Sequence, residues 1–115
     1  MSDPNSFLPM PTAVFYILVA LADRDRHGYS IMQDVVARTD GKVRLSDGTL
    51  YSSIRRMLEQ GVVEELSESP DPESHERGRY FYRLTQWGRR VAIAEAKRLS
   101  DMLSQARETG LIPKC

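Results

Sequence analysis

The segment from Asp40 to Leu66 reads DGKVRLSDGTLYSSIRRMLEQGVVEEL. Its order of residue types predicts a turn, a short helix, a stop at Gly61 and the start of a strand. The helix begins after Ser46, a good N-cap, with Asp47 in the first turn, where the helix dipole favours a negative charge. At about 100° per residue, its apolar residues fall within one narrow sector. They are Leu50, Ile54, Met57 and Leu58.

The opposite face of this helix carries small hydroxyls and two arginines. It contains Gly48, Thr49, Ser52, Arg55, Arg56 and Glu59, with Tyr51 at the boundary. Small residues keep the leading end slim enough for the DNA major groove, which is about 12 Å wide. Guanidinium groups can reach phosphates or guanine edges, and a tyrosine hydroxyl can donate to a phosphate. We therefore predict a recognition helix; the alternative is an amphipathic surface helix whose arginines are solvated.

Two strand-like runs follow, Val62–Leu66 and Arg79–Leu84, and the second alternates with the period of a strand. The connector SESPDPESHERG is polar, holds two prolines and predicts a flexible loop rather than a tight hairpin. The strands would form a wing, in which Arg77 and Arg79 are candidates for minor-groove or backbone contact. The alternative is that the wing arginines pair within the chain with nearby acids. Those acids are Glu64, Glu65 and Glu76.

Two helices are expected before this segment. The first, roughly Pro11 to Ala22, is apolar on every side and must be covered on more than one face, partly by its own domain and otherwise by a second subunit. The second runs from about Tyr29 to Thr39, with Gly41 as its C-cap. The predicted fold class is therefore mostly α with a small β-wing (α+β). A flexible N-terminal arm covers residues 1–10, and a winged helix-turn-helix covers residues 11–84.

The last helix is predicted from Thr85, its N-cap, to about Thr109, a length of roughly 35 Å. Its apolar residues are spaced 4, 3, 4 and 3 apart, as in a coiled coil, and the small ones allow close approach. This seam consists of Ala92, Ala96, Leu99, Leu103 and Ala106. Such a helix is longer than a small winged domain needs, so we predict a dimerisation helix over 85–110 and a tail over 111–115. The alternative is that the seam packs on its own domain.

Composition places limits on the class of protein. The chain has 115 residues, 41% of them hydrophobic, which fits one domain with a packed core. Lys+Arg and Asp+Glu number 16 each, so bulk charge alone does not favour nucleic acid. The charge is nevertheless sorted, because residues 64–76 hold six acids and no Lys or Arg, whereas residues 77–90 hold five arginines and no acid.

The chain shows no sign of export or membrane insertion. Its single cysteine, Cys115, excludes an intrachain disulfide framework and fits a reducing compartment. No secretory signal is visible, and the longest apolar run, residues 13–22, is ten residues long, too short to cross a bilayer. We expect a soluble cytoplasmic protein with no membrane partner.

Catalysis finds little support in the sequence. His27 lies in a turn before a glycine, and His75 lies in the acidic connector, without a recognisable nucleophile motif near either. We expect His27 to bond the backbone locally, with a DNA phosphate contact as the alternative. No metal-ligand spacing or phosphate-binding glycine loop appears, so we expect no enzyme, metal site or cofactor. The lone Trp87 is either a packing residue at the wing–helix junction or one wall of a ligand pocket between subunits.

Three segments together resemble the PadR-like transcriptional regulators, over about residues 11–109. They are HGYSIMQDV (27–35), KVRLSDGTLYSSIRRMLEQGVVEE (42–65) and RYFYRLTQWGRRV (79–91). The short class of that family has one C-terminal helix. The resemblance implies a homodimeric winged helix-turn-helix, usually a repressor that a small molecule releases from DNA. One departure is Asp47, where many relatives have an uncharged residue; a carboxylate there would repel phosphate unless it caps the helix or accepts from a cytosine amine.

Site residues follow from the resemblance by position. It places a set of side chains against DNA: Tyr29, Ser46, Gly48, Thr49, Tyr51, Ser52, Arg55 and Arg56, with Arg77 and Arg79 at the wing. It places the dimer contact at Val14, Leu18, Ala96, Leu99 and Leu103. The ligand site transfers poorly, because members of the family use different pockets.

The sequence thus predicts a regulator that binds double-stranded DNA as a homodimer on a palindromic operator, most simply a repressor with a small-molecule effector. The alternative is a winged-helix interaction module that never touches DNA and holds a protein partner through the acidic stretch 64–76 and the apolar first helix. Salt dependence separates the two, because DNA binding weakens steeply with salt.

Overall fold

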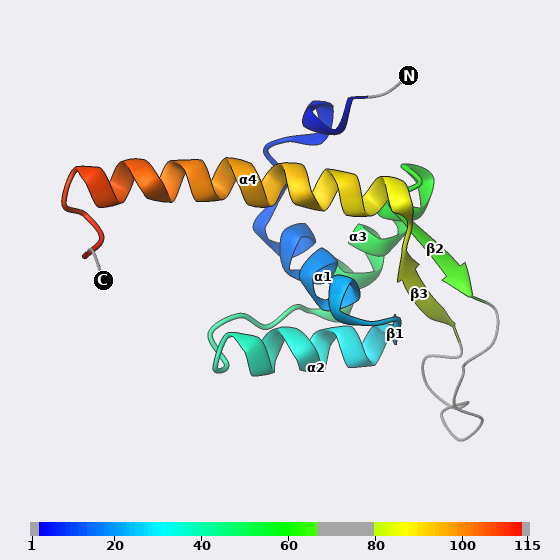
Figure 1. The fold of residues 1–115 in the computed structure, drawn as a ribbon. Helices are drawn as coiled ribbons and strands as arrows, with labels where there is room; N and C mark the ends of the chain where they lie inside the picture. The colour runs from blue at the N-terminus through cyan, green and yellow to red at the C-terminus, as the bar shows by residue number, and fades with distance from the viewer. Residues whose placement is uncertain (1–2, 67–79, 114–115) are drawn as a thin grey trace.

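The structure, a computed structural model, describes residues 3–66 and 80–113. In these residues four α-helices pack together with a small sheet at one edge, and a short 3-10 helix precedes them (Figure 1). In chain order the elements are η1 (Pro4–Phe7), α1 (Thr12–Asp23), β1 (Arg26–His27), α2 (Gly28–Arg38), α3 (Asp47–Glu59), β2 (Val63–Leu66), β3 (Phe81–Leu84) and α4 (Gln86–Glu108). The predicted class, mostly α with a small β-wing, is confirmed, and each predicted helix lies within one or two residues of its predicted ends.

Local capping chemistry explains where α3 and α4 begin. The Ser46 hydroxyl accepts a hydrogen bond from the Thr49 N–H at 3.1 Å, and the Thr85 hydroxyl accepts from the Gly88 N–H at 2.9 Å. Each bond satisfies one of the orphan donors at a helix N-terminus and contributes about 1 kcal/mol. Both N-caps were predicted from the sequence and are confirmed.

Helices α2 and α3 end in the same way but with different residues. Gly61 follows α3 with a φ of 72°, and the Val62 N–H donates to the Met57 carbonyl at 2.9 Å. After α2 the left-handed position is taken by Asp40, with a φ of 53°, and Gly41 comes one residue later. The prediction of Gly41 as the C-cap is thus displaced by one residue, because an aspartate tolerates the left-handed region.

The sheet has three antiparallel strands in the order β1-β3-β2. Strands β2 and β3 are the predicted wing, with Val63 opposite Leu84 and Leu66 opposite Phe81. Strand β1 was not predicted, because two residues are too few to show a period. The effect of β1 is on its neighbour β3, in which Phe81 and Tyr82 are both buried. The Phe81 ring meets the His27 ring of β1 edge-on, with centroids 5.5 Å apart.

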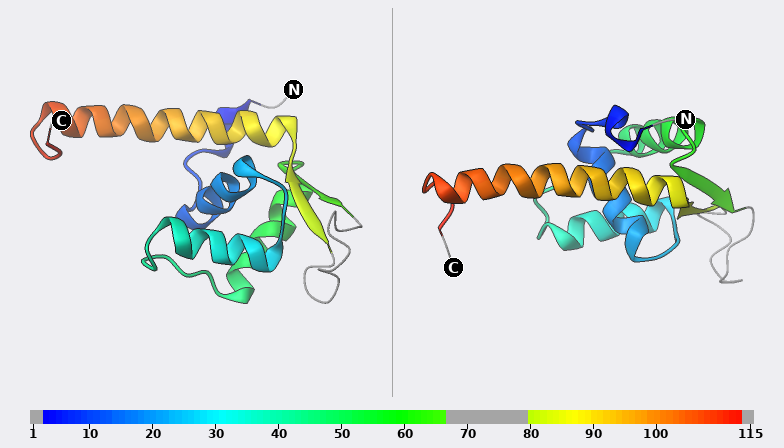
Figure 2. Two further views of the ribbon diagram at one scale, coloured as in Figure 1. Left: turned by 60° about the horizontal axis from the view of Figure 1, so that its bottom comes forward. Right: turned by 45° about the horizontal axis from the view of Figure 1, so that its top comes forward.

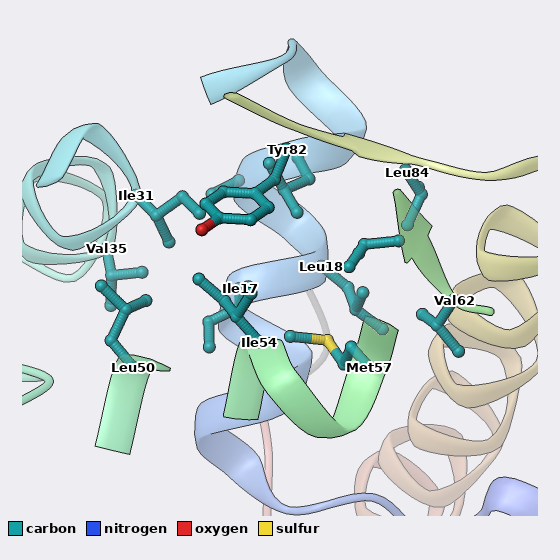
Figure 3. Packing of buried hydrophobic residues seen from close by; sticks show 13 residues of the cluster. Ile17, Leu18, Ile31, Val35, Leu50, Ile54, Met57, Val62, Tyr82 and Leu84 are labelled. Atoms are coloured by element: carbon teal, nitrogen blue, oxygen red, sulfur yellow. The ribbon is translucent and has the colours of Figure 1, made fainter. Parts of the chain in front are cut away.

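Helix α1 is the centre of the hydrophobic core (Figure 3). Its Ile17 and Leu18 are at most 1% exposed and pack among side chains of α2, α3 and the sheet. Those side chains include Ile31, Val35, Leu50, Ile54, Met57, Val62, Tyr82 and Leu84. The apolar character of Ile17, Leu18, Ala20 and Leu21 in α1 is therefore explained by packing within the domain itself.

Helix α4 leaves the wing through a close backbone contact at Gly88. The Thr85 N–H and hydroxyl both bond the Val62 carbonyl, at 3.1 and 3.0 Å, and a Cβ on Gly88 would lie 1.9 Å from that same oxygen. Beyond this contact Val91 and Glu95 are buried against the domain, whereas the C-terminal half of α4 projects past the other elements (Figures 1 and 2).

The described part of the N-terminal segment, for which the sequence predicts a flexible arm over residues 1–10, makes several contacts with α4. Residues 4–7 form η1, and the Phe7 ring meets the Trp87 ring edge-on at 5.9 Å. The Met10 N–H donates to Glu95 at 3.2 Å, and Arg98 holds the same carboxylate with bonds of 2.6 and 2.9 Å. These bonds hold the pKa of Glu95 below its usual value, the Arg98 guanidinium being the larger cause. The described part of the segment is thus packed on α4.

Candidate nucleic-acid interface

Helix α3 presents the polar face that the sequence predicts. Leu50, Ile54 and Met57 are at most 2% exposed and hold the helix against the core. The residues on the opposite side are all exposed: Gly48, Thr49, Ser52, Arg55, Arg56 and Glu59. A helix anchored on one side and covered by hydroxyl and guanidinium groups on the other has the shape and chemistry to enter a major groove.

The two arginines of α3 are available for an external anion. Neither Arg55 nor Arg56 forms an ion pair with any residue in 3–66 or 80–113. By contrast, Arg26 pairs with Asp34 of α2 at 3.0 Å. Arg38 pairs with Asp34 of the same helix at 2.6 Å and with Asp23 at the end of α1 at 3.4 Å. Arginine side chains without an internal carboxylate keep all their donors for phosphates or base edges.

Asp47 does not cap α3, since the Ser46 hydroxyl does so. It is exposed in the first turn, where the positive end of the helix dipole stabilises its carboxylate by about 0.3–1 kcal/mol. Of the two roles considered for this departure from the family pattern, helix capping is therefore excluded by the structure.

The start of α2 lies against the outer edge of α3. A Cβ on Gly28 would be only 2.4 Å from the Tyr51 hydroxyl oxygen, so these two residues are in direct contact. Tyr51 and Tyr29 are 43% and 41% exposed and lie at this edge. The contribution of Gly28 was missed by sequence reasoning; the signal was a glycine directly before a helix, at a point where another backbone or ring approaches closely.

His27 bonds the backbone locally. Its Nδ1 accepts a hydrogen bond from the Ser30 N–H at 3.1 Å and so caps α2, and its ring packs edge-on against Phe81. Burial, and to a lesser degree the neighbouring Arg26 charge, lower the pKa of His27 and so favour the neutral ring that this bond requires. The predicted backbone bond is confirmed.

The wing is described only in part. Arg77, Arg79 and Glu76, on which the predicted wing contacts depend, lie outside the described residues. Within the sheet, Arg83 forms its ion pair with Asp25 at 3.2 Å rather than with Glu64, the residue opposite it in the register. Glu64 and Glu65 remain exposed on β2.

The predicted dimer residues fall into three groups. Leu18 is 1% exposed within its own chain, so the expectation that it lines the dimer contact is wrong. Val14 is half-buried at the start of α1. Along α4, the seam residues are accessible: Ala96 and Leu103 are exposed, and Ala92, Leu99 and Ala106 are half-buried. Ile93 and Met102, 61% and 55% exposed, are further apolar residues on α4 that the seam pattern did not include.

Trp87 has two packing partners among the described residues. The Phe7 ring lies 5.9 Å away, and the Arg90 guanidinium lies over the indole at 5.4 Å. These contacts are those of a packing residue at the wing–helix junction.

Neither a cluster of metal-binding side chains nor a membrane-spanning helix occurs among the described residues. They contain no group of three or more His, Cys, Asp or Glu side chains arranged to hold a metal ion. Nor is any helix among them both long and apolar enough to span a bilayer.

Comparisons with known proteins match this geometry. The model of the transcriptional regulator PadR-like family matches residues 17–94. An uncharacterized protein of Lysinibacillus sphaericus is 28% identical over 98 residues, which cover 80% of this chain and 87% of that protein. A PadR family transcription regulator from Clostridium difficile has a similar fold, with a TM-score of 0.70 and 19% identity, covering 86% of this chain and 98% of its own. A transcriptional regulator from Clostridium thermocellum gives a TM-score of 0.69 at 20% identity, covering 86% and 89%. The chain therefore belongs to the PadR-like family of transcriptional regulators.

Proposed function

We propose that this protein is a repressor that binds a two-fold symmetric DNA operator as a homodimer and responds to a small molecule. The observation that carries the DNA-binding part is the exposed α3 face, where Arg55 and Arg56 stand beside hydroxyls without an ion pair to any described residue. No catalytic activity forms part of the proposal. The cytoplasmic location expected from the sequence remains part of it.

Each arginine has a distinct expected contribution. A guanidinium that reads a guanine edge contributes about 1–3 kcal/mol to one position of the site, whereas one that contacts phosphate contributes to all sequences alike. Losing a phosphate contact also reduces the slope of log affinity against log salt by about 0.9. The two roles are therefore separable by measuring affinity against sequence and salt.

The test begins with selection of bound duplexes from random DNA, which should enrich an inverted repeat. Fluorescence anisotropy then compares Arg55→Ala and Arg56→Ala with Arg107→Ala, an exposed arginine near the end of α4. We expect both α3 variants to lose about tenfold or more in affinity, and the control to stay within about twofold. Equal affinity of all three variants for the selected duplex would contradict the assignment of α3.

The homodimer is supported by the projecting half of α4. Leu103 and Met102 are 46% and 55% exposed there, on a helix of 23 residues that extends past the rest of the domain (Figure 1). Apolar side chains on an unsupported helix favour a second copy of the same helix as cover. Two such subunits would place their α3 helices on successive major grooves, about 34–36 Å apart.

Sedimentation equilibrium tests this part with a matched pair of variants. Leu103→Glu places a charge on the seam, and Ser104→Glu places the same charge one residue away on an exposed position. We expect the first to be monomeric at micromolar concentration and the second to remain dimeric. Dimers of unchanged strength in Leu103→Glu would show that the seam is not the interface.

A further inference from the structure

A cavity of about 540 Å³ lies between the N-terminal segment, α1 and α3. The volume is in the range of small-molecule sites, about 300–1,000 Å³. Sixteen residues line it, and its walls come from three parts of the fold: the arm residues 6–11, one side of α1, and one flank of α3.

The base of the cavity is apolar and preformed. Leu18, Met57, Val62 and Val91 line it, and each is at most 2% exposed. The arm wall is held in place by the bond from the Met10 N–H to buried Glu95. A pocket built on core side chains exists before the ligand arrives, so little ordering opposes binding.

The rim of the cavity has a single sign of charge. Among the described residues that line it, Arg56 is the one with a charge, and none of them carries a carboxylate. This guanidinium is exposed and has no ion pair within the described chain, while Ser53 and Gln60 add neutral polar groups beside it. An apolar base with one unpaired cation at its edge is complementary to a molecule that has an apolar body and one negative group.

The same rim belongs to the proposed DNA-binding face. Thr49, Ser52 and Arg56 line the cavity, and all three are on the exposed face of α3. An anion bound to Arg56 would neutralise a charge that DNA needs and would occupy the flank that approaches the phosphates. Trp87 is not among the lining residues, although Phe7, which packs against its ring, is one of them.

We propose that this cavity binds a small amphipathic monoanion, with its apolar body on the base and its carboxylate or sulfonate on Arg56, and that the bound anion excludes DNA. The exclusion of DNA rests on the proposed function; the binding of the anion does not. Two dyes of nearly the same shape test the binding: 8-anilinonaphthalene-1-sulfonate, an anion, and N-phenyl-1-naphthylamine, its neutral counterpart.

Fluorescence titration of the full chain needs no DNA. We expect the anionic dye to bind once per chain, and Arg56→Gln to weaken it about tenfold, as expected for loss of a hydrogen bond to a charged group. Arg55→Gln, on the same helix but outside the cavity, should change it by less than about twofold. The neutral dye should bind both variants equally. Equal loss of the anionic dye in both variants, or none in either, would overturn the site.

A second variant tests the location. Ala13 lines the cavity from α1, and Ala13→Phe should fill it and remove binding of both dyes while circular dichroism shows a folded protein. Undiminished binding in folded Ala13→Phe would overturn the location; if that variant does not fold, the Arg56→Gln comparison alone decides. Dye affinity that falls as protein concentration rises, together with weaker self-association of Ala13→Phe, would show a second copy as the occupant and would also overturn the proposal.

The coupling to DNA is tested last. Titrating the selected duplex into the dye complex should release the anionic dye, and the dye should raise the apparent Kd for duplex in inverse proportion to the fraction of protein that the dye leaves unoccupied. A dye that binds through Arg56 and stays bound at saturating duplex would overturn the exclusion of DNA. If no duplex binds at all, the proposed function fails while the result for the anion stands.

Discussion

Replacing Gly88 by alanine tests the contact that joins α4 to the wing. The new Cβ would lie 1.9 Å from the Val62 carbonyl oxygen, 2.8 Å from its carbon and 3.0 Å from Leu84 Cδ1. Two of these atoms are backbone, so no side-chain rotation can relieve the overlap. Helix α4 must move away by roughly 1 Å or more to restore ordinary contact distances.

That movement would weaken or break hydrogen bonds made by Thr85. Its N–H and hydroxyl bond the Val62 carbonyl at 3.1 and 3.0 Å, and its hydroxyl also accepts from the residue 88 N–H at 2.9 Å. Overpacking costs about 1–3 kcal/mol, and each lost hydrogen bond costs about 1 kcal/mol. We expect Gly88→Ala to lower the free energy of unfolding by about 3–5 kcal/mol, which lowers Tm by about 12–20 °C.

Gly48→Ala is the matched control, because Gly48 is also in the first turn of a helix. A Cβ there meets only the Ser46 hydroxyl oxygen, at 3.9 Å, so the helix propensity of alanine should leave stability unchanged or raise it by up to about 1 kcal/mol. Urea unfolding followed by circular dichroism measures both variants. The reasoning is refuted if Gly88→Ala unfolds at the same urea concentration as the unmodified protein.

Three further substitutions have defined outcomes. Because the pKa of His27 is lowered in the fold, the unfolded chain binds more protons below about pH 6.5, so stability should fall as pH drops from there; His27→Asn keeps a cap and should remove that slope. Glu95→Gln should lower the free energy of unfolding by about 1–2 kcal/mol in urea, because it weakens the pair with Arg98. Gly28→Ala should push the Tyr51 ring aside, lowering affinity for the selected duplex about tenfold with less than about 1 kcal/mol of destabilisation.

Each of these has an outcome that would contradict it. For His27→Asn it is a pH profile of unfolding that still falls in parallel with that of the unmodified protein. For Glu95→Gln it is an unchanged urea midpoint, which would mean that the arm does not depend on this carboxylate. For Gly28→Ala it is unchanged DNA affinity. An equal loss of DNA affinity in Tyr51→Phe and Gly28→Ala that comes from instability alone would also contradict it. Thermal unfolding of both variants shows whether they are unstable.

The predicted DNA-binding face was within reach of the sequence because its signals are local. Ser46 and Thr85 bond N–H groups three residues away, and the apolar sector of α3 repeats with the helical period. Each of these patterns involves only residues within one or two helical turns of each other. The exposure of Arg55 and Arg56 follows from the same helical period, because they lie opposite Leu50 and Ile54.

The errors came from contacts between distant parts of the chain. Leu18 looked like a candidate for a subunit contact because α1 is apolar throughout, but α2, α3 and the sheet cover that side. The contact of Met10 with Glu95, 85 positions further on, likewise had no signal in residues 1–10, which are rich in proline and polar side chains. A pattern of residue types carries no information about which remote element will be the neighbour.

The amino-acid sequence by itself determined the order of the helices, their capped ends and the polar face of α3, because each depends on residues a few positions apart. Only the tertiary structure decided that β1 joins the sheet, that Tyr51 rests on Gly28, and that a cavity opens beside Arg56. These features arise where separate segments meet, and the packing of the whole core selects which segments those are.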